Sequence, residues 1–180
     1  AQAMATLAML PPPAGHAGVP MHAPVLIFPR VFEPAFCRRL IDLYEERGGG
    51  ESGFMRDVNG KTVGINDYSH KRRKDCVIED EQFQAQFRAR LTAFNFNPTR
   101  IERYIVACYD GADKGFFRAH RDNTTKGTAH RRFAVTINLN TGEYEGGELC
   151  FPEFGPQTYV APAGGAVVFS CSLLHEARPV

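Results

Sequence analysis

The sequence predicts an α+β domain in which two helices come first and short strands fill the second half. The chain has 180 residues, of which 43% are hydrophobic and 23% charged, so one domain with a sizeable core is expected. Apolar residues recur at helical spacing in two segments before residue 95. From Ile101 onward, short β-rich runs alternate with Gly, Asp, Asn and Pro.

Residues 1–23 carry no acid, Lys or Arg and are rich in Ala, Met, Gly and Pro, which predicts a linker or tail. A signal peptide is the alternative, because residues 4–10 are mildly apolar, but a basic segment before them is missing. The sequence opens on Ala1 and not on Met, so a linker excised from a longer protein, with a further domain upstream, is an open alternative. The folded domain is expected over residues 24–180.

The first helix is predicted over residues 34–47, with Pro34 in its first turn and three consecutive glycines from Gly48 ending it. Its apolar residues recur at helical spacing: Phe36, Leu40, Leu43 and Tyr44. The second helix is predicted over residues 81–94. Its stripe of large residues favours a core face over a cofactor site: Phe83, Phe87, Leu91 and Phe94. Between the helices, the abundance of Gly, Ser and Asn in residues 48–67 predicts a mobile lid.

The strands are predicted at residues 101–109, 116–120, 133–139, 148–151, 158–160 and 166–171. In the run 133–139, the odd-numbered residues are large and the even-numbered ones small or polar. The large face is expected to pack on the core, and the other face borders a pocket or solvent.

Charge and cysteine content exclude several classes of protein. The formal net charge is only +1 and no apolar run is long enough to span a membrane, so neither nucleic acid nor a membrane is an expected partner.

Five scattered cysteines without a C-x-x-C pair predict buried reduced thiols and a cytoplasmic setting. The basic run 70–74 could steer an acidic substrate or a phosphate backbone, but a solvated loop or an edge strand is the preferred interpretation.

His120 and Asp122 are two residues apart in a predicted strand, so their side chains can converge on one point. His175 follows another apolar strand and can supply a third ligand. Two imidazoles and one carboxylate on one face of an ion form the facial triad of non-haem Fe(II) oxygenases. A zinc hydrolase accepts the same ligands, with Asp110 or Glu176 as its base, and spacing alone does not choose between them.

Five motifs occur in a fixed order from residue 109 to the end of the chain. They are YDGADKGFFRAHRDN at 109–123, RFAVTINLN at 132–140, EGGELCFP at 145–152, PAGGAVVF at 162–169 and HEARPV at 175–180. Together they resemble the prolyl 4-hydroxylase-type 2-oxoglutarate/Fe(II) dioxygenases, over roughly residues 101–180. This ordered set is far more specific than His-x-Asp alone.

The resemblance implies a double-stranded β-helix (jelly-roll, cupin-like) barrel buttressed by the helices. It implies Fe(II) held by His120, Asp122 and His175, with 2-oxoglutarate and O2 as cosubstrates, ascorbate dependence, and release of succinate and CO2 as a C–H bond is hydroxylated. Tyr109 matches the position whose phenol meets the far carboxylate of 2-oxoglutarate. Asn138 and Arg118 are further candidates for that cosubstrate, Arg118 because it shares the parity of His120.

The substrate implied is a prolyl or other peptidyl side chain, an amino acid or a small molecule. The family anchors the far carboxylate with an Arg or Lys beyond the distal histidine, and this sequence stops at Val180. We therefore expect a domain that lacks its last strand. A non-catalytic β-helix module that binds a metal or ligand without turnover is the alternative function.

Overall fold

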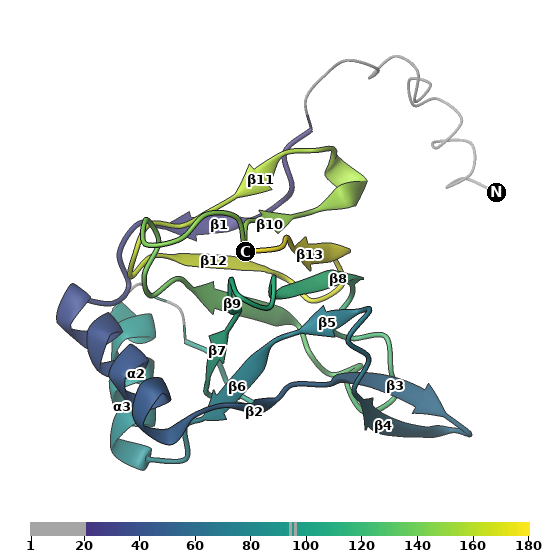
Figure 1. Ribbon diagram of the computed structural model, residues 1–180, viewed down its shortest axis with the longest axis horizontal. Helices are drawn as coiled ribbons and strands as arrows, with labels where there is room; N and C mark the ends of the chain where they lie inside the picture. The colour runs from purple at the N-terminus through teal and green to yellow at the C-terminus, as the bar shows by residue number, and fades with distance from the viewer. Residues whose placement is uncertain (1–20, 94, 96) are drawn as a thin grey trace.

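The computed structural model describes residues 21–93, 95 and 97–180, so most of the predicted 1–23 tail lies outside the described residues (Figure 1). Within that tail, Ala23 is buried, and its amide donates a hydrogen bond to the hydroxyl of Tyr159 at 2.7 Å. The packed part of the chain therefore includes Ala23.

The first helix is confirmed at its predicted bounds, α2 (Pro34–Arg47). Pro34 occupies the first turn, and the chain leaves the helix at Gly48 with φ of 70°, a conformation that glycine adopts without strain. The second helix is confirmed as α3 (Glu81–Ala93), while the predicted Phe94 lies outside the described residues. The guanidinium of Arg90 in α3 lies 4.0 Å from the centroid of the Phe36 ring in α2 and pairs with Glu33.

Each of the six predicted strands is confirmed, with shorter bounds at most ends. The strands are β1 (Leu26–Phe28), β2 (Gly50–Glu51), β3 (Phe54–Val58), β4 (Lys61–Ile65), β5 (Lys71–Arg72), β6 (Lys74–Val77), β7 (Ile105–Cys108), β8 (Phe116–His120), β9 (Phe133–Ile137), β10 (Leu149–Cys150), β11 (Thr158–Tyr159), β12 (Ala166–Ser170) and β13 (His175–Ala177). A 3-10 turn, η2 (Pro152–Phe154), joins β10 to β11.

The strands form separate sheets. One has the order β1-β12-β9, one β11-β10-β13-β8-β5, one β2-β6-β7, and β3 pairs with β4 as a hairpin. Figure 1 shows α2 and α3 side by side at one end, with the β3–β4 hairpin at the opposite end. Within the described residues the sheets do not close into the expected barrel, and its buttressing by helices stays a prediction.

Two hydrophobic clusters lie on either side of β9 and β12. The first joins both helices to the sheets, and its buried members include Phe36, Leu40, Val106 and Ala166. Val135 and Ile137 pack against it, whereas Ala134 packs against the second cluster, around Phe151 and Phe169. The predicted two-faced strand is therefore confirmed over most of its length. Phe133 is an exception, because the first cluster does not extend to the start of β9 and this ring is 64% exposed.

Residues 48–67 contain β2 and the regular β3–β4 hairpin, and their role as a mobile lid stays a prediction. The turn is Asn59-Gly60, with φ of 50° and 79°, which is the two-residue turn that matches the twist of paired strands. An Asn-Gly pair between two short alternating runs is a hairpin signal, and the glycine-rich composition obscured it.

The five cysteines are free, and all but Cys108 are buried, as expected for reduced thiols. None of the helices in the described residues is long and apolar enough to cross a membrane.

Candidate metal centre

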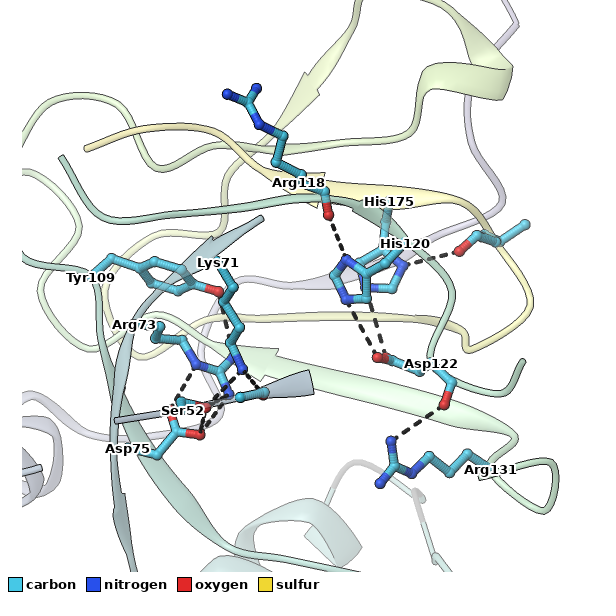
Figure 2. Close-up of polar contacts among 12 residues, drawn as sticks. Ser52, Lys71, Arg73, Asp75, Tyr109, Arg118, His120, Asp122, Arg131 and His175 are labelled. Carbon is cyan, nitrogen blue, oxygen red and sulfur yellow. Dashed lines mark hydrogen bonds and ion pairs between the residues drawn. The ribbon is translucent and has the colours of Figure 1, made fainter. Parts of the chain in front are cut away.

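Strand pairing brings the three predicted ligands together. His120 ends β8 and His175 begins β13, and these antiparallel strands place the two histidines directly opposite each other. Asp122 follows β8, where its amide donates a hydrogen bond to the carbonyl of Cys171, at the end of β12, at 3.0 Å. One potential ligand atom from each of the three side chains lies within 4.8 Å of the other two. Figure 2 shows the carboxylate of Asp122 facing both imidazoles.

Each histidine is held by a backbone carbonyl on its Nδ1 side. Nδ1 of His120 lies 2.8 Å from the carbonyl oxygen of Arg118, and Nδ1 of His175 lies 3.0 Å from that of Leu173. A carbonyl can only accept, so these contacts place the ring hydrogen on Nδ1 and leave a lone pair on Nε2. The two Nε2 atoms lie 3.5 Å and 3.7 Å from the oxygens of Asp122. The three donor atoms are therefore directed at one another.

The surroundings favour a neutral imidazole at His175 and an ionised carboxylate at Asp122. Burial and then the neighbouring His120 lower the pKa of His175. Burial acts to raise the pKa of Asp122, but its interactions with the two facing histidines outweigh burial and hold that pKa below its ordinary value. A neutral imidazole and an ionised carboxylate are the forms that bind a metal.

Aromatic rings fix the orientation of both imidazoles. The ring of Phe117 stacks on His120 with centroids 3.5 Å apart and planes 19° from parallel. The rings of Phe169 and Phe151 lie 4.6 Å and 6.3 Å from that of His175. These contacts limit rotation of the side chains and help to exclude water from one side of the triad.

Arg118 does not lie beside the triad, although its parity predicted that it would. The register between β8 and β13 shifts: Phe117 pairs with Ala177 and His120 pairs with His175. Between these two pairs β8 therefore has one residue more than β13, which is a β-bulge. This bulge turns Phe117 and His120 to the same side and Arg118 to the other. In Figure 2 the guanidinium of Arg118 points away from Asp122, and its Nε donates to the carbonyl of Ser69 at 3.3 Å.

Tyr109 follows β7, and its hydroxyl accepts a hydrogen bond from Nη1 of Arg73 at 3.4 Å. Burial raises the pKa of Tyr109, and the Arg73 charge opposes this only in part, so the phenol keeps its hydrogen. No contact within the described residues uses that hydrogen. Figure 2 shows the Tyr109 hydroxyl directed toward Lys71 and Arg73.

Asn138 makes its contacts elsewhere. Its amide nitrogen donates to the hydroxyl of Thr141 at 3.0 Å and to the carbonyl of Ala161 at 3.3 Å. Its backbone is also bonded to Gly164 and Gly165. The contacts of Asn138 therefore brace the turn that precedes β12.

The residues that sequence reasoning missed are a polar cluster of Ser52, Lys71, Arg73 and Asp75, in which Lys71 is buried and the other three are half-buried. Arg73 pairs with Asp75 through an Nε–Oδ1 distance of 2.7 Å. Lys71 is 5% exposed and donates to the hydroxyl of Ser52 and the carbonyl of Gly53, each at 2.7 Å. Burial, then the Arg73 charge, lower the pKa of Lys71 to about 7. The solvated-loop interpretation of the 70–74 run is therefore wrong for these side chains, although β5 is an edge strand as predicted.

Comparison with known proteins supports this reading of the centre. The model of the 2OG-Fe(II) oxygenase superfamily matches residues 104–180, which include Tyr109 and the three triad residues. A PKHD-type hydroxylase of Verminephrobacter eiseniae is 34% identical over 91 residues, covering 46% of this chain and 37% of the relative. The chain thus spans little more than a third of that relative. The predicted resemblance is confirmed, since residues 104–180 match the model of the 2OG-Fe(II) oxygenase superfamily.

Solved structures show the same fold at low identity. A viral collagen prolyl hydroxylase from Paramecium bursaria Chlorella virus-1, in complex with 2OG, has a TM-score of 0.60 at 16% identity, covering 91% of this chain and 92% of that one. A Pseudomonas putida prolyl-4-hydroxylase has a TM-score of 0.60 at 16% identity, covering 93% and 89%. A Trichoplax adhaerens prolyl hydroxylase, in complex with a hypoxia inducible factor peptide fragment, has a TM-score of 0.58 at 15% identity, covering 92% and 80%. The chain therefore has the jelly-roll fold of 2OG oxygenases.

Proposed function

We propose that this chain is the dioxygenase domain of an Fe(II)- and 2-oxoglutarate-dependent hydroxylase, and that His120, Asp122 and His175 hold the metal. One observation carries the proposal: three side chains from separate parts of the sequence converge with their ligand atoms within 4.8 Å. The match to the family model supports the choice of Fe(II), 2-oxoglutarate and O2 for this site.

The donor set fits Fe(II). Two neutral imidazole nitrogens and one carboxylate oxygen on one side of an ion leave its remaining positions open for small ligands. The backbone carbonyls of Arg118 and Leu173 accept hydrogen bonds from Nδ1 of His120 and His175, which keeps the Nε2 lone pair of each histidine available for the metal. Fe(II) bound with 2-oxoglutarate and O2 supplies the oxidation, in which a C–H bond is hydroxylated and 2-oxoglutarate yields succinate and CO2.

Tyr109 is our candidate for the far carboxylate of 2-oxoglutarate. Its phenol hydrogen has no acceptor among the described residues, and Arg73 adds a positive charge 3.4 Å from its oxygen. A carboxylate that accepts from the phenol would also be attracted by this guanidinium. The contacts of Asn138 and the orientation of Arg118 favour neither residue for this role.

For the substrate we propose a peptidyl side chain, with proline as the first candidate. The support is the character of the structural relatives, which are prolyl hydroxylases, one of them in complex with a peptide. Another peptidyl side chain, a free amino acid and a small molecule are the further candidates. Ascorbate dependence stays a prediction.

Succinate release from 2-oxoglutarate tests the proposal. Wild-type protein with Fe(II), ascorbate and a panel of proline-containing peptides is compared with Asp122→Ala and with His22→Ala, which changes an exposed histidine that is not part of the triad. We expect turnover in the wild type and in His22→Ala, and none in Asp122→Ala. Binding of metal and 2-oxoglutarate without turnover on any substrate would favour the non-catalytic module. Hydrolysis that requires zinc and does not depend on 2-oxoglutarate would favour the alternative of a zinc hydrolase.

A further inference from the structure

A groove of about 530 Å³ lies on the outer face of the five-stranded sheet, on the opposite side of β8 from the triad. Phe116 and Arg118 of β8 line it, together with Arg72 of β5 and Glu176 of β13. The bulge that turns His120 inward is the same feature that turns Arg118 into this groove. Its volume is in the range of ligand-binding clefts.

The groove gathers positive charge that the protein does not neutralise. Its four basic residues are Arg72, Lys114, Arg118 and Arg178, against the single carboxylate of Glu176. Among the described residues, none of the four forms an ion pair with an acid. The net charge of the whole chain is only +1, so this excess is local to the groove. Like charges held close together repel, and a bound anion relieves that repulsion.

Two of the guanidiniums are fixed before any ligand arrives. The Cζ atoms of Arg72 and Arg118 lie 5.9 Å and 5.0 Å from the centroid of the Phe116 ring. Arg72 also donates to the carbonyls of Tyr68 and Asp113, each at 3.2 Å, and Nε of Arg118 donates to a backbone carbonyl. The terminal nitrogens of Arg118 have no partner among the described residues. A side chain held in this way loses little entropy when it binds a carboxylate.

We propose that this groove binds an acidic peptide segment. Guanidiniums bind carboxylates in a two-point geometry, and the apolar surface of Phe116 and Pro179 can receive the side chains between them. A nucleic acid fits less well, because Glu176 interrupts the positive surface and the chain has no broad basic field. The groove and the triad lie on opposite sides of β8, so this inference stands whether or not the chain oxidises 2-oxoglutarate.

Fluorescence anisotropy at low salt tests the inference, with a labelled peptide that alternates Glu, Asp and Ala and a matched peptide in which Gln and Asn replace the acids. We expect the acidic peptide to bind more tightly, and the double variant Arg118→Gln/Arg178→Gln to weaken it about tenfold. The control Arg30→Gln/Arg47→Gln removes the same charge from exposed positions outside the groove and should leave binding unchanged.

A gain-of-binding variant separates the inference from misfolding. Glu176→Gln removes the one acid of the groove and should tighten binding of the acidic peptide about threefold. Equal binding of the two peptides, no loss in the Arg118→Gln/Arg178→Gln variant, or tighter binding of an oligothymidine probe than of the acidic peptide would each overturn the proposal.

Discussion

Replacing Phe117 with leucine should weaken metal binding, because the imidazole of His120 would be less well fixed before the metal binds. Phe117 is 8% exposed, its ring stacks on His120 at 3.5 Å, and the Lys71 ammonium lies 4.6 Å from its centroid. Leucine keeps most of the buried apolar area but removes both ring contacts. Below pH 7, where Lys71 is protonated, the stack contributes about 1 kcal/mol and the cation–ring contact about 1 kcal/mol, so we expect Phe117→Leu to lower the free energy of unfolding by about 1–3 kcal/mol.

If Phe117 no longer fixes His120, metal binding should become weaker by about the free energy of the stacking contact. About 1 kcal/mol corresponds to a roughly fivefold weaker dissociation constant. Titration calorimetry with Mn(II), which O2 does not oxidise readily, measures this constant, and urea denaturation of the metal-free protein measures stability.

Phe36→Leu is the matched control. Phe36 is 3% exposed and has ring contacts of 4.9 Å with Phe32 and 5.6 Å with Phe87, in the cluster around the helices. It should lose similar stability with no change in the metal dissociation constant. If both variants weaken metal binding equally, the loss reflects general destabilisation and the reasoning about His120 is wrong.

Three further predictions concern single positions. The pKa of Lys71 is lowered to about 7 from 10.5, so between these pH values the unfolded chain binds a proton that the folded chain does not. The wild type should therefore gain stability relative to Lys71→Met as the pH rises through this window. A constant difference between their denaturation curves at several pH values would contradict this. Gly146→Ala should lower the free energy of unfolding by about 2 kcal/mol or more, because Gly146 has φ of 80° and a methyl group would collide with the Pro179 carbonyl. The control is Gly64→Ala, where nothing lies within 4 Å of the added methyl group. Equal stability of the two variants would contradict the steric argument. Asn138→Ala should lower the unfolding free energy by about 1–2 kcal/mol and leave 2-oxoglutarate affinity unchanged, whereas a tenfold loss of affinity by calorimetry would restore a cosubstrate role.

The helices and most strands could be predicted because their signals are local. Pro34 at the start and Gly48 at the end mark α2 within the sequence itself. The same holds for β8, whose predicted and observed bounds coincide. The convergence of His120 with His175 is not local, and it was predicted from the ordered motifs rather than from spacing.

The orientation of Arg118 could not be predicted, since it depends on a register shift against β13. Parity along one strand assumes regular pairing, and only the partner strand shows where that pairing breaks. The polar cluster of Lys71, Arg73 and Asp75 was missed for a different reason. These residues alternate with Arg72 and Lys74, which is the pattern of a strand, but their charge suggested a solvated run. Mutual pairing allows such residues to be buried.

Anaerobic titration of the wild-type protein with Fe(II), with and without 2-oxoglutarate, measures whether His120, Asp122 and His175 form the metal centre. We expect one Fe(II) per chain, 2-oxoglutarate binding that depends on the metal, loss of both in His175→Ala, and retention of both in His22→Ala. Metal binding of unchanged affinity in His175→Ala would contradict the assignment of His120, Asp122 and His175 as the metal centre.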